Sequence, residues 1–127
     1  MAIRTELTLR LQNSPSALGR VCQLLGDAKI GIRALSLETG GTVRLVVDNP
    51  LNAVGILEAE HYAVQQRDVL FVQLPNGSGA LHQITRLLAT AGVNIDYAYG
   101  GSLEVQDMAA VVVGVDDAQR ASMAAGM

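Results

Sequence analysis

LRLQNSPSALGRVCQLLGDAKIGIRALS, residues 9–36, recurs later in the chain as VQLPNGSGALHQITRLLATAGVNIDYAY, residues 72–99. A shift of 63 positions aligns the two stretches without a gap. The residues identical in both copies are Leu11, Asn13, Ala17, Leu18, Leu24, Leu25, Ala28 and Ile32, which recur as Leu74, Asn76, Ala80, Leu81, Leu87, Leu88, Ala91 and Ile95. Repeats of this kind decide an architecture, so we expect two copies of one structural unit.

Each copy begins with a strand, a turn and a helix. Ile3, Leu7, Leu9 and Leu11 alternate with polar residues at the period of a half-buried strand. Pro15 suits the first helical turn, and apolar residues then follow at helical spacing in both copies. Gly92 is placed to end its helix in the left-handed conformation, where the first copy has the less favourable Lys29.

The rest of each copy predicts a hairpin and a second helix. Strands are expected at 30–37, 42–47 and 62–68 and at 93–99 and 108–115, and the helix within 48–61 has an Asp cap and an early Pro. The order βαββαβ predicts an α+β fold of two tandem ferredoxin-like repeats, residues 1–68 and 69–127, each an antiparallel sheet with helices on one face.

The second repeat lacks its last strand. Its hairpin is longer, so the position equivalent to Tyr62 falls just beyond residue 127. An unpaired sheet edge is a liability that a protein has to manage. Three alternatives are open: another chain completes the edge, the edge stays unpaired, or the chain is a shortened form of a longer protein.

The sheet faces turned away from the helices differ between the repeats. In the first they carry Arg4, Glu6, Thr8, Arg10 and Arg44, an ordinary solvent-exposed face. In the second, the apolar face consists of Val69, Phe71, Ala110 and Val112. Such a face usually covers something, so we expect it to form a homodimer; the alternative is that the two repeats fold over one another.

Composition excludes several classes of partner. The net charge is −3, which disfavours nucleic acid, and no apolar run is long enough to span a membrane. The single cysteine excludes an internal disulfide and favours a cytoplasmic setting. Cys22 lies on a helical apolar stripe and is expected to fill the core.

The glycine-rich turn before Ala80 lacks the chemistry of a phosphate loop. A Walker loop needs Lys and Ser or Thr after its last glycine, and the dinucleotide fingerprint needs a third glycine. His61 and His82 are the only histidines, and they form no metal-ligand cluster with Cys22. We therefore expect no cofactor, no metal and no catalytic residue, and we read Asp116 and Asp117 as helix caps.

The turn itself remains as a candidate site in both copies. A helix N-terminus offers unpaired N–H groups to a carboxylate, and Asn13 or Asn76 can offer an amide to an amine and an acid. This combination suits a free amino acid. An ordinary capped turn uses the same residue types.

The two repeated stretches resemble the signature of ACT domains. That signature is an Asn-x-Pro-Gly-like turn, then Ala-Leu, an amphipathic helix and an Ala-Gly-Ile-Asn-Ile-like entry to the second strand. The resemblance covers the whole chain and is strongest to the stand-alone tandem ACT proteins, which carry no catalytic domain. It implies a non-catalytic, allosteric regulatory module that binds amino acids where the first turn of one domain meets the second strand of its neighbour.

The resemblance also implies site residues in each repeat. The first repeat departs from the family at Ser16 and Gly31, and the second at Ser78, so the second keeps more of the pattern. The implied ligand-binding residues are Asn13, Ser14, Ser16, Ala17, Leu18, Ile30 and Ile32 in the first repeat and Asn76, Gly77, Ser78, Gly79, Ala80, Leu81, Val93, Asn94 and Ile95 in the second.

Two other function classes stay open. The protein could be a dimerising, protein-interacting regulatory subunit of a metabolic enzyme that binds no ligand. A small ferredoxin-like enzyme such as an acylphosphatase fits less well, because neither turn contains the Arg that its chemistry requires.

Overall fold

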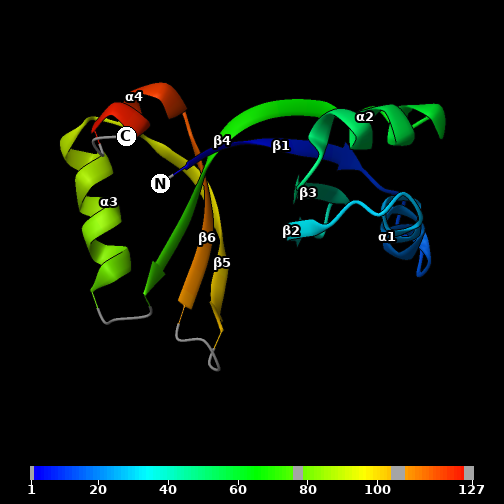
Figure 1. The fold of residues 1–127 in the computed structure, drawn as a ribbon, viewed down its shortest axis with the longest axis horizontal. Helices are drawn as coiled ribbons and strands as arrows, with labels where there is room; N and C mark the ends of the chain where they lie inside the picture. Colours follow the sequence, from blue (N-terminus) through cyan, green and yellow to red (C-terminus); the bar gives the residue numbers. More distant parts are fainter. Residues whose placement is uncertain (1, 76–78, 104–107, 125–127) are drawn as a thin grey trace. The chain divides into compact units, whose positions relative to one another are not determined.

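The computed structural model describes residues 2–75, 79–103 and 108–124 (Figure 1). The elements in chain order are β1 (Ala2–Arg10), α1 (Ala17–Asp27), β2 (Ile32–Leu37), β3 (Thr42–Val47), α2 (Pro50–Ala59), β4 (Gln65–Pro75), α3 (Ala80–Thr90), β5 (Ile95–Leu103), β6 (Met108–Val115) and α4 (Ala118–Ala124). The α+β class and the βαββ order of both repeats are confirmed.

The chain divides into two compact units. The first unit is Thr5–Arg67, and the second unit joins residues 2–4 to the described residues from Asp68 onward. The strands form one six-stranded sheet in the order β2-β3-β1-β4-β6-β5, so the prediction of a separate sheet for each repeat is wrong. Both β1 and β4 therefore contribute residues to each unit, so that each unit contains four strands.

The first unit has the expected sheet and core. β3 pairs antiparallel with β1, with Leu7 opposite Leu45 and Leu9 opposite Val43, and β2 pairs antiparallel with β3. Side chains of these strands form one apolar cluster with Val21 and Leu25 of α1 and with α2. The helices thus cover one face of the sheet, as the alternation of apolar residues predicts.

The second unit repeats this plan. β6 pairs antiparallel with β4 and with β5, and its core joins Leu70, Val72 and Val113 to Leu88 of α3. Both edge strands carry an irregularity at equivalent positions, between Ile32 and Ala34 and between Ile95 and Tyr97. The repeat therefore extends to the details of strand pairing.

The last strand missing from the second repeat is replaced from within the chain. Residues 2–4 of β1 belong to the second unit, and Ile3 packs against its core. With β1 next to β4, the strand order β1-β4-β6-β5 matches the order β4-β1-β3-β2 of the first unit. The expectation that another chain completes this edge, or that it stays open, is wrong, because the N-terminal half-strand occupies it.

The helix ends follow the sequence with two corrections. The N-cap of α2 is Asn49 and not Asp48, because the side-chain oxygen of Asn49 accepts a hydrogen bond from the N–H of Asn52 at 3.2 Å. Pro50 is the first residue of the helix. Pro15 lies in the turn before α1, not in its first turn. Gly92 and Lys29 both adopt the left-handed conformation, with φ of 70° and 61°.

The predicted surfaces also need correction. Val69 and Val112 are buried within the single chain, and Phe71 and Ala110 are half-buried, so only part of the expected apolar face is open to a partner. Glu6, expected in solvent, is fully buried. Cys22 is only half-buried and is not a member of the core clusters formed by the described residues.

Candidate functional site

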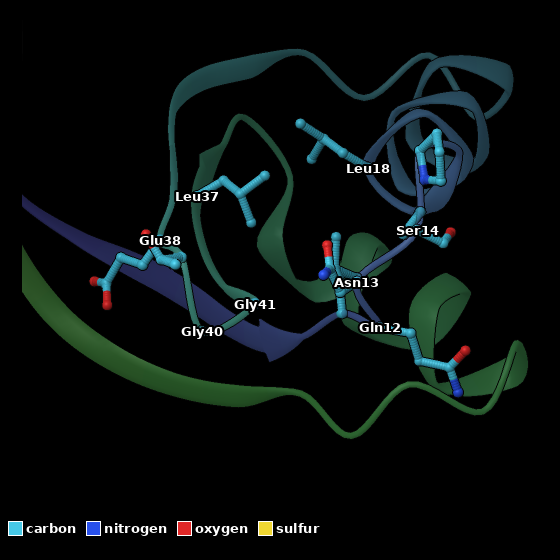
Figure 2. Close-up of a pocket in the computed structure, with 12 residues that line it drawn as sticks. Gln12, Asn13, Ser14, Leu18, Leu37, Glu38, Gly40 and Gly41 are labelled. Carbon is cyan, nitrogen blue, oxygen red and sulfur yellow. The ribbon is translucent and has the colours of Figure 1, made fainter.

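A pocket of about 620 Å³ lies within the first unit, between the turn that joins β1 to α1 and the hairpin that joins β2 to β3 (Figure 2). Its volume falls in the range of small-molecule sites. The lining residues are Leu11, Gln12, Asn13, Ser14, Pro15, Ala17, Leu18, Leu37, Glu38, Thr39, Gly40 and Gly41.

The wall formed by the β1–α1 turn presents the start of a helix. The N–H of Ser14 donates to Gln12 O at 2.8 Å, and the N–H of Ala17 donates to Ser14 O at 3.3 Å. Ser16 is the N-cap, and its side chain makes no capping hydrogen bond. Within the described part of the chain, the N–H groups of Leu18 and Gly19 have no acceptor, which leaves them available to a ligand.

The hairpin wall is fixed to the end of β1. The N–H of Leu11 donates to Gly41 O at 2.8 Å, and the N–H of Gly41 donates to Glu38 O at 2.9 Å. Gly41 has a φ of 90°, and a Cβ atom there would overlap the carbonyl oxygen of Leu11. Only glycine fits this position, so Gly41 determines the shape of the hairpin wall.

The two walls have an apolar character where they face each other. Figure 2 shows the side chains of Leu18 and Leu37 directed towards the space between helix and hairpin, with Asn13 on the turn below them in this view. Leu37 is 49% exposed, which is high for a leucine. The Glu38 carboxylate points away from this space and pairs with Arg44.

The pocket contains some of the predicted site residues of the first repeat and not others. Asn13, Ser14, Ala17 and Leu18 line it, and Ser16 adjoins it as the N-cap of α1. Ile30 and Ile32 do not line it: Ile30 is buried in the core of the first unit, and Ile32 packs against that core. These two residues hold the sheet to the helices.

Sequence reasoning missed the hairpin wall, Leu37–Gly41. A topological signal was available, because β3 pairs antiparallel with β1 and brings Thr42 opposite Arg10. The start of β3 must then lie beside the end of β1. The hairpin that precedes β3 is therefore adjacent to the β1–α1 turn in any ferredoxin-like unit of this order.

The second repeat is described only in part at the equivalent place. Asn76, Gly77 and Ser78 lie outside the described residues. Gly79 is the N-cap of α3 with a φ of 92°, Ala80 begins the helix, and Leu81 is 52% exposed. Val93 is buried in the core of the second unit, and Ile95 is 36% exposed at the start of the edge strand β5.

Asn94 has a structural partner. Its N–H donates to Asp116 Oδ1 at 3.1 Å, and its side-chain amide donates to Asp96 Oδ1. The first unit repeats this bridge, with the N–H of Gly31 donating to Asp48 Oδ2 at 3.0 Å. Asp116 thus braces the start of β5, whereas Asp117 accepts the N–H of Arg120 as a helix cap, so one of the two predicted caps is confirmed.

The described residues contain neither a metal-binding cluster nor a membrane-spanning helix. No group of three or more His, Cys, Asp or Glu side chains in residues 2–75, 79–103 and 108–124 is arranged to hold a metal ion. In the same residues, no helix has both the length and the apolar character needed to cross a bilayer.

Family comparison identifies the class of protein. The model of the ACT domain pair matches residues 1–124, so this chain belongs to the ACT domain pair family. The resemblance found in the repeated stretches is confirmed over nearly the whole chain. No curated protein gave a match.

Solved structures show the same fold. Protein BT0572 from Bacteroides thetaiotaomicron has a TM-score of 0.87 and 27% identity, with coverage of 96% of this chain and 85% of that one. The ligand-free regulatory subunit of aspartate kinase from Thermus thermophilus has a TM-score of 0.68 and 15% identity, with coverage of 99% and 96%. Aspartokinase III of E. coli, in complex with lysine and aspartate, has a TM-score of 0.61 and 20% identity, with coverage of 99% of this chain and 32% of the enzyme.

Proposed function

We propose that this ACT domain pair is a non-catalytic regulatory protein that binds a free amino acid at the β1–α1 turn of its first unit. The observation that carries the proposal is the pocket of about 620 Å³ at that turn, lined by Asn13, Ser14, Ala17 and Leu18. These residues come from the segment whose pattern suits a zwitterion, so sequence and geometry point to the same place.

The groups at the pocket match the two ends of an amino acid. The N–H group of Leu18, which lines the pocket, lies at the positive end of the α1 dipole and suits an α-carboxylate. The amide of Asn13 can accept from an α-ammonium group. Aspartokinase III of E. coli, of which this chain covers 32%, was solved in complex with lysine and aspartate, which is consistent with an amino acid as the class of ligand.

Binding in this pocket is suited to regulation. The turn and the hairpin belong to different parts of the sequence and meet at the end of the sheet. A ligand that contacts both walls binds best to the conformation in which the turn and the hairpin are close. It therefore shifts the equilibrium towards that conformation.

A thermal-shift panel of the common amino acids tests the proposal. A ligand at about a hundred times its Kd should stabilise the folded protein by ~2.7 kcal/mol, which raises the melting temperature by several degrees. Asn13→Ala should abolish the shift while leaving the melting temperature of the free protein nearly unchanged, because Asn13 is exposed. The absence of a shift with every amino acid at millimolar concentration would contradict the proposal.

A second candidate is a dimerising interaction subunit without a ligand. The edge strand β2 carries Leu35 and Leu37, which are 38% and 49% exposed. Exposed leucines on an edge strand favour pairing with another chain. Light scattering tests this: a dimer that Leu35→Glu converts to a monomer favours the second candidate, and a wild-type monomer at micromolar concentration counts against it.

A further inference from the structure

We infer that the pocket of the first unit selects a neutral amino acid with an aliphatic side chain. The inference rests on the proposed function and adds the chemical class of the ligand. The selectivity would come from the apolar and charged groups of the two walls that contact the ligand's side chain. These are different groups from those that would hold its α-carboxylate and α-ammonium.

The apolar part of the pocket is formed by leucines on opposite walls. Leu18 projects from α1 and Leu37 from the end of β2 towards the same space (Figure 2). Leu37 is 49% exposed and Leu18 is half-buried, so both present uncovered apolar surface to the pocket. An aliphatic side chain placed between them removes that surface from water, at roughly 25 cal/mol per Å².

The charged part of the lining is small and already paired. The twelve residues that form the pocket include no Lys, Arg or His, and Glu38 is their one carboxylate. Glu38 pairs with Arg44, and its side chain points away from the space between the leucines. An acidic ligand side chain would find no cation among the lining residues, and a basic one would compete with Arg44 for Glu38.

These two features act against charged ligands together. An ionised side chain placed between Leu18 and Leu37 loses part of its hydration and gains no counter-charge from the lining residues, which is unfavourable. Arg10 lies beside the lining at Gly40, where its Nη2 would be 3.9 Å from a Cβ atom, and not among the residues that form the pocket. The neutral groups at the helix start and Asn13 remain free for the α-carboxylate and α-ammonium. The pocket therefore differs in specificity from a site for lysine or aspartate, the ligands present in the aspartokinase III complex.

Isothermal titration with pairs of similar shape tests the class of ligand. Leucine is compared with asparagine and aspartate, and norleucine with lysine, so that size is held nearly constant while polarity changes. We expect leucine or norleucine to bind at least tenfold more tightly than the matched polar amino acid, since missing apolar contacts of this size change affinity by roughly that factor or more. Equal or tighter binding of aspartate or lysine overturns the inference and leaves the proposed function intact, whereas no binding of any amino acid overturns both.

Two leucines of the same strand provide a matched pair of variants. Leu37→Ala removes apolar surface from the pocket, and Leu35→Ala removes a similarly exposed leucine from the same face of β2 outside the pocket. We expect Leu37→Ala to weaken binding of the aliphatic ligand about tenfold and Leu35→Ala to leave it within about twofold. Equal Kd values for the two variants would overturn the inference, and both should fold because each leucine is well exposed.

Discussion

The two units differ most in how each obtains its fourth strand. In the first unit the fourth strand is formed by residues 65–67 of β4, which follows α2 of the same unit. In the second unit it is formed by residues 2–4 of β1. Both then have the same strand order. A repeat that lacks a fourth strand of its own can thus still form a four-stranded unit, because β1 and β4 each contribute residues to both units of the six-stranded sheet.

The units also differ in their outer faces. Thr8 and Arg44 pair on the outer face of the first unit, while Phe71, Val112 and Tyr99 form a row across the second. Gly114 lies under the ring of Tyr97, which leaves no room for a Cβ atom. The core positions facing the helices are therefore shared by the two repeats, while the residues on the other face of the sheet differ between them.

The largest expected effect comes from equivalent core leucines. Leu25 and Leu88 occupy the same position of the repeat, and both are fully buried. Replacing either with alanine should lower the free energy of unfolding by about 3 kcal/mol, through lost burial and a cavity. Urea denaturation followed by circular dichroism measures both variants. A difference of more than about 2 kcal/mol between them would show that the two cores are not equivalent.

A smaller effect is expected in the hairpin wall of the pocket. Gly41→Ala forces an L-residue into positive φ and brings its Cβ against Leu11 O, at a cost of about 2 kcal/mol or more. The neighbouring Gly40→Ala is the control, because its Cβ would meet only Arg10 Nη2 at 3.9 Å. Thermal denaturation separates the two variants. Equal stability would mean that Gly41 does not fix the hairpin.

Much of this fold was predictable because the core positions repeat. Leu18, Val21 and Leu25 gave the helical face of α1, and the alternation from Leu7 to Leu11 gave β1. The role of residues 2–4 could not be predicted from the repeat. The repeat places the fourth strand of the second unit after β6, whereas residues 2–4 come from the start of the chain. The burial of Glu6 was also not predicted. The alternation of residues shows which face of the sheet a side chain lies on, but it does not show what covers that face.

The candidate site was predicted on one wall only. The β1–α1 turn carries the residue types that bind a carboxylate, and four of the predicted residues line the pocket. Ile30 and Ile32 were assigned to the site by resemblance, yet their side chains pack into or against the core. The hairpin wall has no recognisable motif, because its contribution comes from the position of β3 beside β1 and from the conformation of Gly41.

The helix ends provide a reciprocal test of the repeat. Lys29 and Gly92 share a left-handed conformation, but only glycine adopts it without steric cost. Lys29→Gly should raise the free energy of unfolding by about 1 kcal/mol, and Gly92→Lys should lower it by a similar amount. Urea denaturation of both variants gives the comparison. Effects of the same sign would contradict the equivalence of these two helix ends.

The smallest expected effects are at the helix caps, where the units again use different residues for one task. Asn49 accepts the N–H of Asn52 at the start of α2, and Asp117 accepts the N–H of Arg120 at the start of α4. Replacing either with alanine should cost about 0.5 to 1 kcal/mol, since one N–H of the first turn loses its acceptor. Asn49→Ser and Asp117→Asn keep an acceptor and serve as controls in the same denaturation experiment. If Asp117→Asn is as destabilising as Asp117→Ala, the charge of Asp117 at the positive end of the helix dipole, and not its hydrogen bond, stabilises α4.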